Sequence, residues 1–181
     1  MHRLFVAIRP PETIRDLLID AMDDSADFRW QNDEQLRLTL RFVGEVERPQ
    51  AEDLAAALGA IRAPTFDVRI HGTGRFEQRS SGALWAGVEP RAPLAGLAAK
   101  VERVCQSVGL EPERRTFHPH ITLARWKGRR GREIAQFLEC TRGLASNPFE
   151  IDRFILFQSR LSRHGAQYEG VASYPLETAS T

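Results

Sequence analysis

The sequence predicts an α+β fold made of two similar lobes of β-sheet with helices on the outside. Two observations lead to this prediction. Short runs of alternating polar and apolar residues, typical of half-buried strands, are separated by single segments with apolar residues at helical spacing. One short pattern also occurs twice, as RLTL at residues 37–40 and HITL at residues 120–123. One copy in each half of the chain favours two pseudo-symmetric lobes around a central cleft.

The first half begins with an apolar run at residues 4–8, which predicts a strand ending before Pro10 and Pro11. Proline suits the first turn of a helix, so a helix is expected over residues 11–22. The other elements expected in this half are strands at 28–30, 36–43, 66–70 and 83–88 and a helix at 49–61. The polar stretch 75–82 predicts a flexible hairpin loop.

The second half follows the same plan. A helix is expected from Pro93 to before Gly109, because apolar residues recur there at helical spacing. It is followed by a strand at 121–126, a basic loop at 127–132, a short helix at 134–140, a long alternating stretch at 149–161 and a strand at 168–176. No linker divides the chain, so we expect one bilobal domain over residues 1–181, with a frayed tail at 177–181.

Composition narrows the class of protein. The chain is 42% hydrophobic and 27% charged, with a formal net charge of +1, so no overall attraction to nucleic acid or to a membrane surface is expected. A basic patch must be local, and the loop 127–132 is either a nucleic-acid contact or a solvated turn. No apolar run has the length of a signal peptide or a membrane span, so the expected compartment is the cytoplasm. Nothing in the sequence suggests more than a monomer.

The repeated pattern places chemistry on one face of the predicted sheet. Residues i and i+2 of a strand share a face, so Arg37 lies beside Thr39, and His120 lies beside Thr122. Two such pairs facing each other would hold a phosphate, and a histidine can transfer protons near neutral pH. Arg125 lies an odd number of residues from His120, so it joins this face only at a bulge or beyond the strand end.

The chain resembles the 2H phosphoesterase superfamily, in particular the bacterial RNA 2′,3′-cyclic phosphodiesterases once named 2′-5′ RNA ligases. The resemblance lies in residues 3–8, 38–45, 84–88 and 117–125, and in 158–161 followed by Tyr168. It implies two His-x-Thr motifs on opposed strands, no cofactor and no metal. His120 and Thr122 match the second motif, Thr39 matches the first, and Arg125 matches a basic residue near the phosphate. His118 is expected to have a structural role.

Arg37 occupies the position of the family's first catalytic histidine. Ring opening by water needs a base and an acid, and the resemblance leaves open which histidine has which role. Arginine binds a phosphate well but cannot release a proton usefully near neutral pH. Arg37 is either native or a deliberate substitution that traps a ligand.

The resemblance therefore implies hydrolysis of 2′,3′-cyclic phosphates, on RNA ends or small nucleotides, to 2′-phosphates, weakened at position 37. The alternative is a module that binds phosphate or RNA ends without turnover. The sequence has no nucleotide-activation motif, so ligation is at most the reverse of ring opening.

Overall fold

The computed structural model describes residues 1–178. The strands are β1 (His2–Ile8), β2 (Arg29–Trp30), β3 (Leu38–Val46), β4 (Phe66–Gln78), β5 (Ser81–Glu89), β6 (His120–Lys127), β7 (Phe149–Ile151), β8 (Arg153–Ser162) and β9 (Gly165–Pro175). The helices are α1 (Glu12–Asp20), α2 (Arg48–Leu58), α3 (Arg91–Ser107) and α4 (Gly131–Cys140), and η1 (Asp33–Gln35) is a short 3₁₀ turn.

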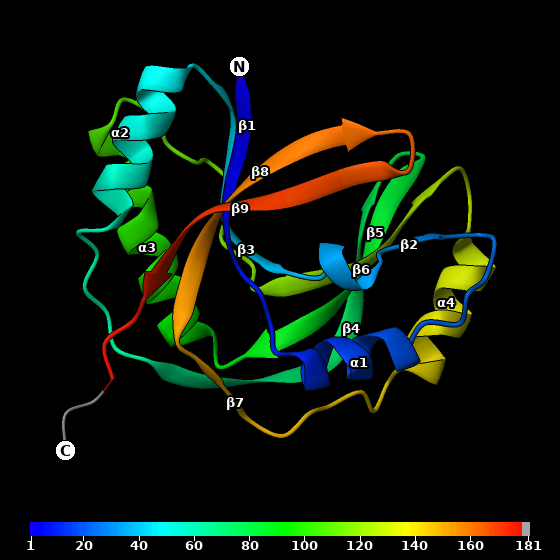
Figure 1. Cartoon of the computed structure of the whole chain (residues 1–181). Coiled ribbons are helices and arrows are strands. Elements are labelled where there is room, and N and C mark those ends of the chain that lie inside the picture. The colour runs from blue at the N-terminus through cyan, green and yellow to red at the C-terminus, as the bar shows by residue number, and fades with distance from the viewer. Residues whose placement is uncertain (179–181) are drawn as a thin grey trace.

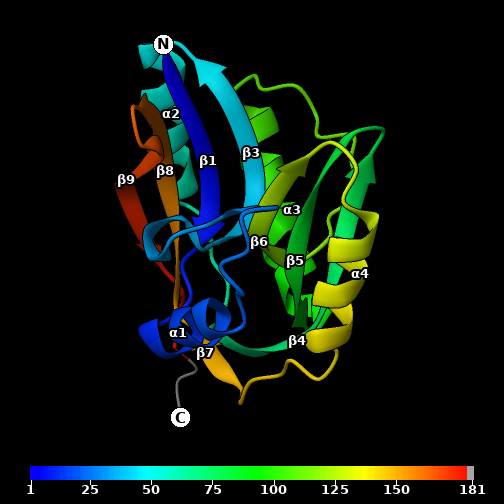
Figure 2. The ribbon, with the colours of Figure 1, turned by 90° about the vertical axis from the view of Figure 1, so that its right-hand side faces the viewer.

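The described strands form one sheet in the order β7-β4-β5-β6-β3-β1-β8-β9, with β2 paired to β6. We call β3, β1, β8 and β9 the first lobe, and β6, β5, β4, β7 and β2 the second lobe. All strand pairs within the lobes are antiparallel, and Figure 2 shows the strands of the two lobes side by side. The lobes join at β3 and β6, where Leu38 pairs with Ile121. The expected α+β fold of two lobes is therefore confirmed.

The helices cover one side of the sheet. Figure 1 shows α2 and α3 together at one end of the molecule and α1 and α4 at the other. Each helix contributes a fully buried side chain to the main core: Leu18, Leu54, Leu94 and Ile134. A smaller cluster of Phe5, Ala7 and Phe157 lies apart from this core and is extended by Ile155 and Tyr168.

Two sequence predictions about local structure are wrong. Residues 75–82 are not a flexible loop, because β4 and β5 stay paired until Gln78 meets Ser81. This arm is exposed over much of its length, so its strands carry the polar side chains that are typical of loops. The stretch 149–161 is not a single strand either, because β7 pairs with β4 in the second lobe whereas β8 pairs with β1 in the first.

The ends of two other elements also differ from expectation. Helix α4 begins at Gly131, three residues before the expected start, and shortens the basic loop. Glu177 is not frayed, because its backbone amide donates to Ala63 and its carbonyl accepts from Thr65, each at 2.9 Å. Residues 179–181 lie outside the described part of the chain. None of the helices in residues 1–178 is long and apolar enough to cross a membrane.

Replacing Gly82 tests the packing of the β4–β5 arm against β6. A Cβ atom at Gly82 would collide with the Trp126 ring and the Phe76 carbonyl oxygen, so Gly82→Ala forces one of them to move. We expect a loss of about 1–3 kcal/mol in the free energy of unfolding, measured by urea denaturation.

Gly96 in α3 is the matched control, because a Cβ atom there meets nothing within 4 Å. Alanine favours helix, so Gly96→Ala should gain roughly 0.5–1 kcal/mol. Equal effects of the two substitutions would contradict the packing described for Gly82.

Candidate active site

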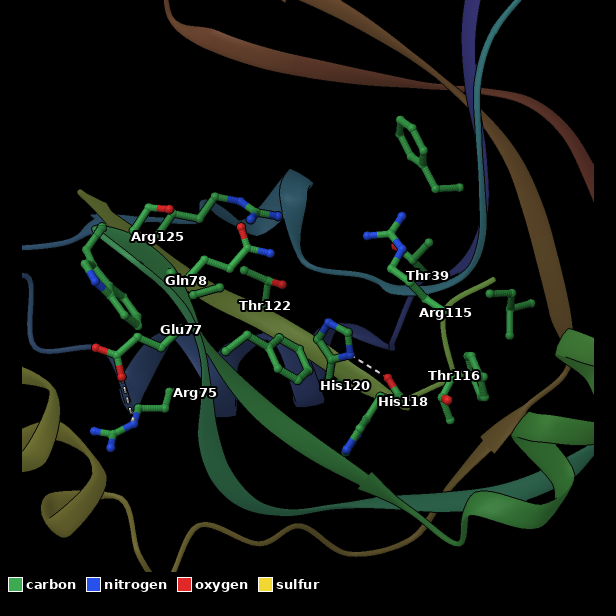
Figure 3. A pocket seen from close by; sticks show the side chains of 18 of the residues that line it. Thr39, Arg75, Glu77, Gln78, Arg115, Thr116, His118, His120, Thr122 and Arg125 are labelled. Carbon is green, nitrogen blue, oxygen red and sulfur yellow. Dashed lines mark hydrogen bonds and ion pairs between the residues drawn. The ribbon is translucent and has the colours of Figure 1, made fainter. Parts of the chain in front are cut away.

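Residues from both lobes line one large cavity of about 1500 Å³ where β3 and β6 meet. Four of the five residues singled out in the two motifs line it: Thr39, His120, Thr122 and Arg125. Figure 3 shows Thr39 on one side of this cavity, the neighbouring pair His120 and Thr122 on the other, and Arg125 beyond Thr122. The antiparallel pairing of Leu38 with Ile121 accounts for this arrangement, because it brings Thr39 to the level of His120.

Each repeat contains a β-bulge at the leucine that follows its threonine. In β3, Thr39 pairs with Ala7 and Arg41 with Val6, so Leu40 is the extra residue. In β6, Thr122 pairs with Trp85 and Ala124 with Leu84, so Leu123 is the extra residue. A bulge shifts the residues after it to the opposite face from the one that strict alternation predicts.

The bulges decide which side chains enter the cleft. The bulge at Leu123 returns Arg125 to the face of Thr122, which is the route that the sequence left open for it. The bulge at Leu40 does the same for Phe42, which is 40% exposed and lines the cavity. Phe42 and Arg125 thus hold equivalent positions in the two lobes, one aromatic and one basic.

His120 has a defined tautomer. Its Nδ1 atom lies 2.5 Å from the carbonyl oxygen of His118, and a carbonyl can only accept, so Nδ1 carries the proton. Nε2 of the neutral ring therefore has a free lone pair. Burial lowers the pKa of His120; the hydrogen bond from its ring raises it, and the charges of His118, Arg125 and Arg37 lower it further. A lowered pKa keeps this imidazole neutral, and thus able to accept a proton, at neutral pH.

Aromatic rings fix the position of His120. The Phe76 ring meets the His120 ring edge-on, with 4.8 Å between the ring centroids, and Phe76 also contacts His118. Trp85 packs against both imidazoles from the neighbouring strand. His118 thus orients His120 through its carbonyl group, which agrees with the structural role expected for it. Phe76 was missed by the sequence analysis because it falls in the stretch predicted to be a loop.

Arg37 lies in a different environment from the other motif residues. Its guanidinium carbon lies 4.6 Å from the centroid of the Phe5 ring and 4.3 Å from that of Tyr168. One terminal nitrogen donates to the Gln35 carbonyl at 2.9 Å, and Nε is buried without a hydrogen-bond partner. In the described part of the chain, Arg37 is not among the residues that line the cavity. The guanidinium is held against two rings that also contact each other, and the side chain does not line the cavity beside Thr39.

The positive charge of Arg37 still acts on groups in the cleft. Burial lowers the pKa of Arg37, Tyr168 raises it and the positive charge of Arg125 lowers it. An arginine pKa starts above about 12, so the group keeps its proton near neutral pH. Arg37 therefore adds a permanent positive charge that also helps to lower the pKa of His120.

Arg41 of β3 is buried beneath the cleft. Its Nε atom donates to Glu102 of α3 at 2.5 Å, and its terminal nitrogens donate to the carbonyl oxygens of Phe42 and Glu111. This ion pair ties α3 to β3, the strand that carries Thr39. Within residues 1–178, no group of three or more His, Cys, Asp or Glu side chains lies close enough to hold a metal ion.

Comparison with known proteins identifies the family. The family model described as the 2′-5′ RNA ligase superfamily matches residues 10–163. An RNA 2′,3′-cyclic phosphodiesterase of Aeropyrum pernix is 35% identical over 152 residues, which cover 82% of this chain and 85% of that protein. A second one, of Geobacillus stearothermophilus, is 34% identical over 153 residues; the match covers 81% of this chain and 47% of that protein, so the chain spans about half of its length.

A solved structure has the same fold. The crystal structure of E. coli LigT complexed with 3′-AMP superimposes with a TM-score of 0.80 at 25% identity, covering 97% of this chain and 98% of that one. The chain belongs to the 2′-5′ RNA ligase superfamily, the group of 2H phosphoesterases that its two motifs resemble.

Proposed function

We propose that this protein hydrolyses 2′,3′-cyclic phosphates, on RNA ends or small nucleotides in the cytoplasm, to 2′-phosphates. The observation that carries the proposal is the neutral His120, whose Nε2 atom is free in a cavity that also holds Thr39, Thr122 and Arg125. The names of the two phosphodiesterase relatives and the 3′-AMP complex of LigT support the same substrate class.

The proposed reaction uses His120 as the general base. Nε2 takes a proton from a water molecule, the water oxygen bonds to phosphorus, and the bond from phosphorus to the 3′-oxygen breaks. Thr39, Thr122 and Arg125 hold the phosphate oxygens and stabilise their growing negative charge. The lowered pKa of His120 supports the base over the acid role that the sequence left open for it.

The leaving 3′-oxygen also needs a proton, and Arg37 does not supply it. A positioned acid contributes on the order of 10² to 10⁴ in rate, so we propose that the reaction is slow by roughly this factor. The leaving oxygen takes its proton from water instead, and the hydroxide that remains is neutralised by the proton that His120 releases. The charge of Arg37 offsets part of the loss by attracting the phosphate, although stacking on Phe5 and Tyr168 holds its guanidinium away from the cavity.

The variant Arg37→His restores the missing acid. We expect kcat for a 2′,3′-cyclic mononucleotide to rise about 10²-fold or more, because an imidazolium can release its proton in the pH range of the assay. The measurement is the amount of phosphate-ester product formed per enzyme molecule per unit time, quantified by chromatography.

Two variants control this experiment. Arg37→Gln removes the charge without adding an acid and should not raise the rate, whereas Arg37→His with His120→Ala should lose the gain. If the parent and Arg37→His are equally active, and His120→Ala changes neither, the catalytic proposal fails.

The pH dependence provides an independent test. The base must be neutral, so kcat/KM of the parent should fall only as the pH drops through the lowered pKa of His120, below the ordinary value of about 6.5. No acidic histidine is needed in the parent, so its profile should stay level on the alkaline side. Arg37→His should instead give a bell-shaped profile. A parent profile that is already bell-shaped around neutral pH would show that another group donates the proton.

One observation favours a second candidate, a module that binds phosphate or RNA ends without turnover. The side chain at position 37 is a buried cation that cannot act as an acid, while the phosphate-binding threonines remain in place. Titration with a nucleoside 2′-phosphate and a 2′,3′-cyclic nucleotide, followed by calorimetry, separates the two functions. Tight binding with the cyclic ligand recovered intact supports the module, and its conversion to the 2′-phosphate rules the module out.

A further inference from the structure

Two arginines lie directly opposite each other at one end of the cleft. Arg29 of β2 pairs with Arg125 of β6, and directly opposed residues of an antiparallel pair point to the same face. Both side chains line the cavity. Neither makes an ion pair within residues 1–178. Like charges in this arrangement destabilise a sheet, so the two side chains are suited to binding anions.

More positive charge surrounds this pair. Lys127 lies two residues beyond Arg125 on β6, lines the same cavity and likewise has no acidic partner in the described residues. Arg75 and Arg130 complete the lining here, each with a carboxylate nearby: Glu77 at 3.6 Å and Asp27 at 3.8 Å. We call Arg29, Lys127, Arg75 and Arg130 the basic end of the cleft.

The opposite end of the cavity has a smaller excess of positive charge. There Arg41 is paired with Glu102 and Arg115 with Glu113, and Arg91 is the remaining cation of the lining. Figure 3 shows Arg115 on the side of Thr39 and Arg125 on the far side of Thr122, so the two ends flank His120. An anionic chain whose end is bound in the catalytic centre is therefore attracted toward the basic end as it extends outward.

We propose that the basic end is a second phosphate site, which holds the internucleotide phosphate next to a terminal nucleotide in the catalytic centre. Successive same-face residues of a strand are about 6.8 Å apart, comparable with the spacing of phosphates along an extended RNA strand. Arg125 thus serves the terminal phosphate, and Lys127 with Arg29 serves the next. This inference rests on the proposed function, and it makes RNA chain ends the preferred substrate over single nucleotides.

The test compares two ligands: a nucleoside 2′-monophosphate and a 5′-fluorescent trinucleotide that ends in a 2′-phosphate. At low salt we expect the parent to bind the trinucleotide about tenfold more tightly or better, by calorimetry and anisotropy. Its affinity should fall more steeply with salt. Each additional contact to a single-strand phosphate makes the slope of log K against log salt more negative by roughly 0.7. The double variant Arg29→Gln, Lys127→Gln should lose most of the advantage, while mononucleotide binding changes less than about threefold.

Arg132→Gln is the matched control, since Arg132 belongs to the same basic segment and is exposed, yet is not among the residues that line the cavity. The proposal is overturned if the parent binds both ligands equally, if Arg132→Gln weakens trinucleotide binding as much as the double variant does, or if the double variant weakens both ligands by the same factor. Hydrolysis of cyclic ends is assayed in parallel. If the parent and Arg37→His both leave cyclic ends intact while the length preference persists, the proposed function fails and the second phosphate site stands.

Discussion

The bulge that follows the threonine in each repeat is the constraint on which the cleft depends. Without the extra residue Leu123, Arg125 would point to the core face, where a guanidinium would need a buried partner. Without Leu40, Phe42 would turn inward in the same way. One local irregularity, used once in each lobe, thus lets a strand present a threonine and, three residues later, a second side chain to the same cavity.

The same bulges explain why the lobes differ beneath the cleft. The residue two positions after each threonine is turned toward the core: Ala124 in the second lobe and Arg41 in the first. Alanine needs no partner, whereas Arg41 is only 8% exposed and depends on Glu102 of α3. Burial alone would raise the pKa of Glu102, but hydrogen bonds from Arg41, the Glu113 amide and Gln106 hold it below its usual range. The carboxylate therefore stays charged, and α3 is fixed against the strand that carries Thr39.

The near-repeat in the sequence was sufficient to predict two lobes and a shared site, because alternation on a strand fixes which residues share a face. It could not locate the bulges, which leave no mark in the polar and apolar pattern: Leu40 and Leu123 read as ordinary inward residues. The sequence indicated the basic end of the cleft only in part, through the basic loop 127–132, for another reason. Arg29 and Arg125 lie far apart in the sequence, and only the pairing of the short strand β2 with β6 brings them together. The exposed arm 75–82 was misread because strands with few buried side chains have the composition of loops.

The arginine at position 37 changes more than the supply of protons. In a site with two histidines, the charge of each depends on the other, and either can be neutral while its partner is protonated. Arg37 removes this mutual dependence, because its own charge is permanent. That charge acts on His120 together with the charge of Arg125. Burial first, and these positive charges after it, lower the pKa of His120 and hold it in the neutral form that a base requires, with Nε2 as the acceptor. In the proposed reaction, His120 is thus a base whose lowered pKa keeps it neutral near neutral pH, and position 37 supplies no matching acid. The fixed positive charges favour ligands rich in phosphate. On this basis we propose that the site holds the end of an RNA chain better than it turns over a single nucleotide.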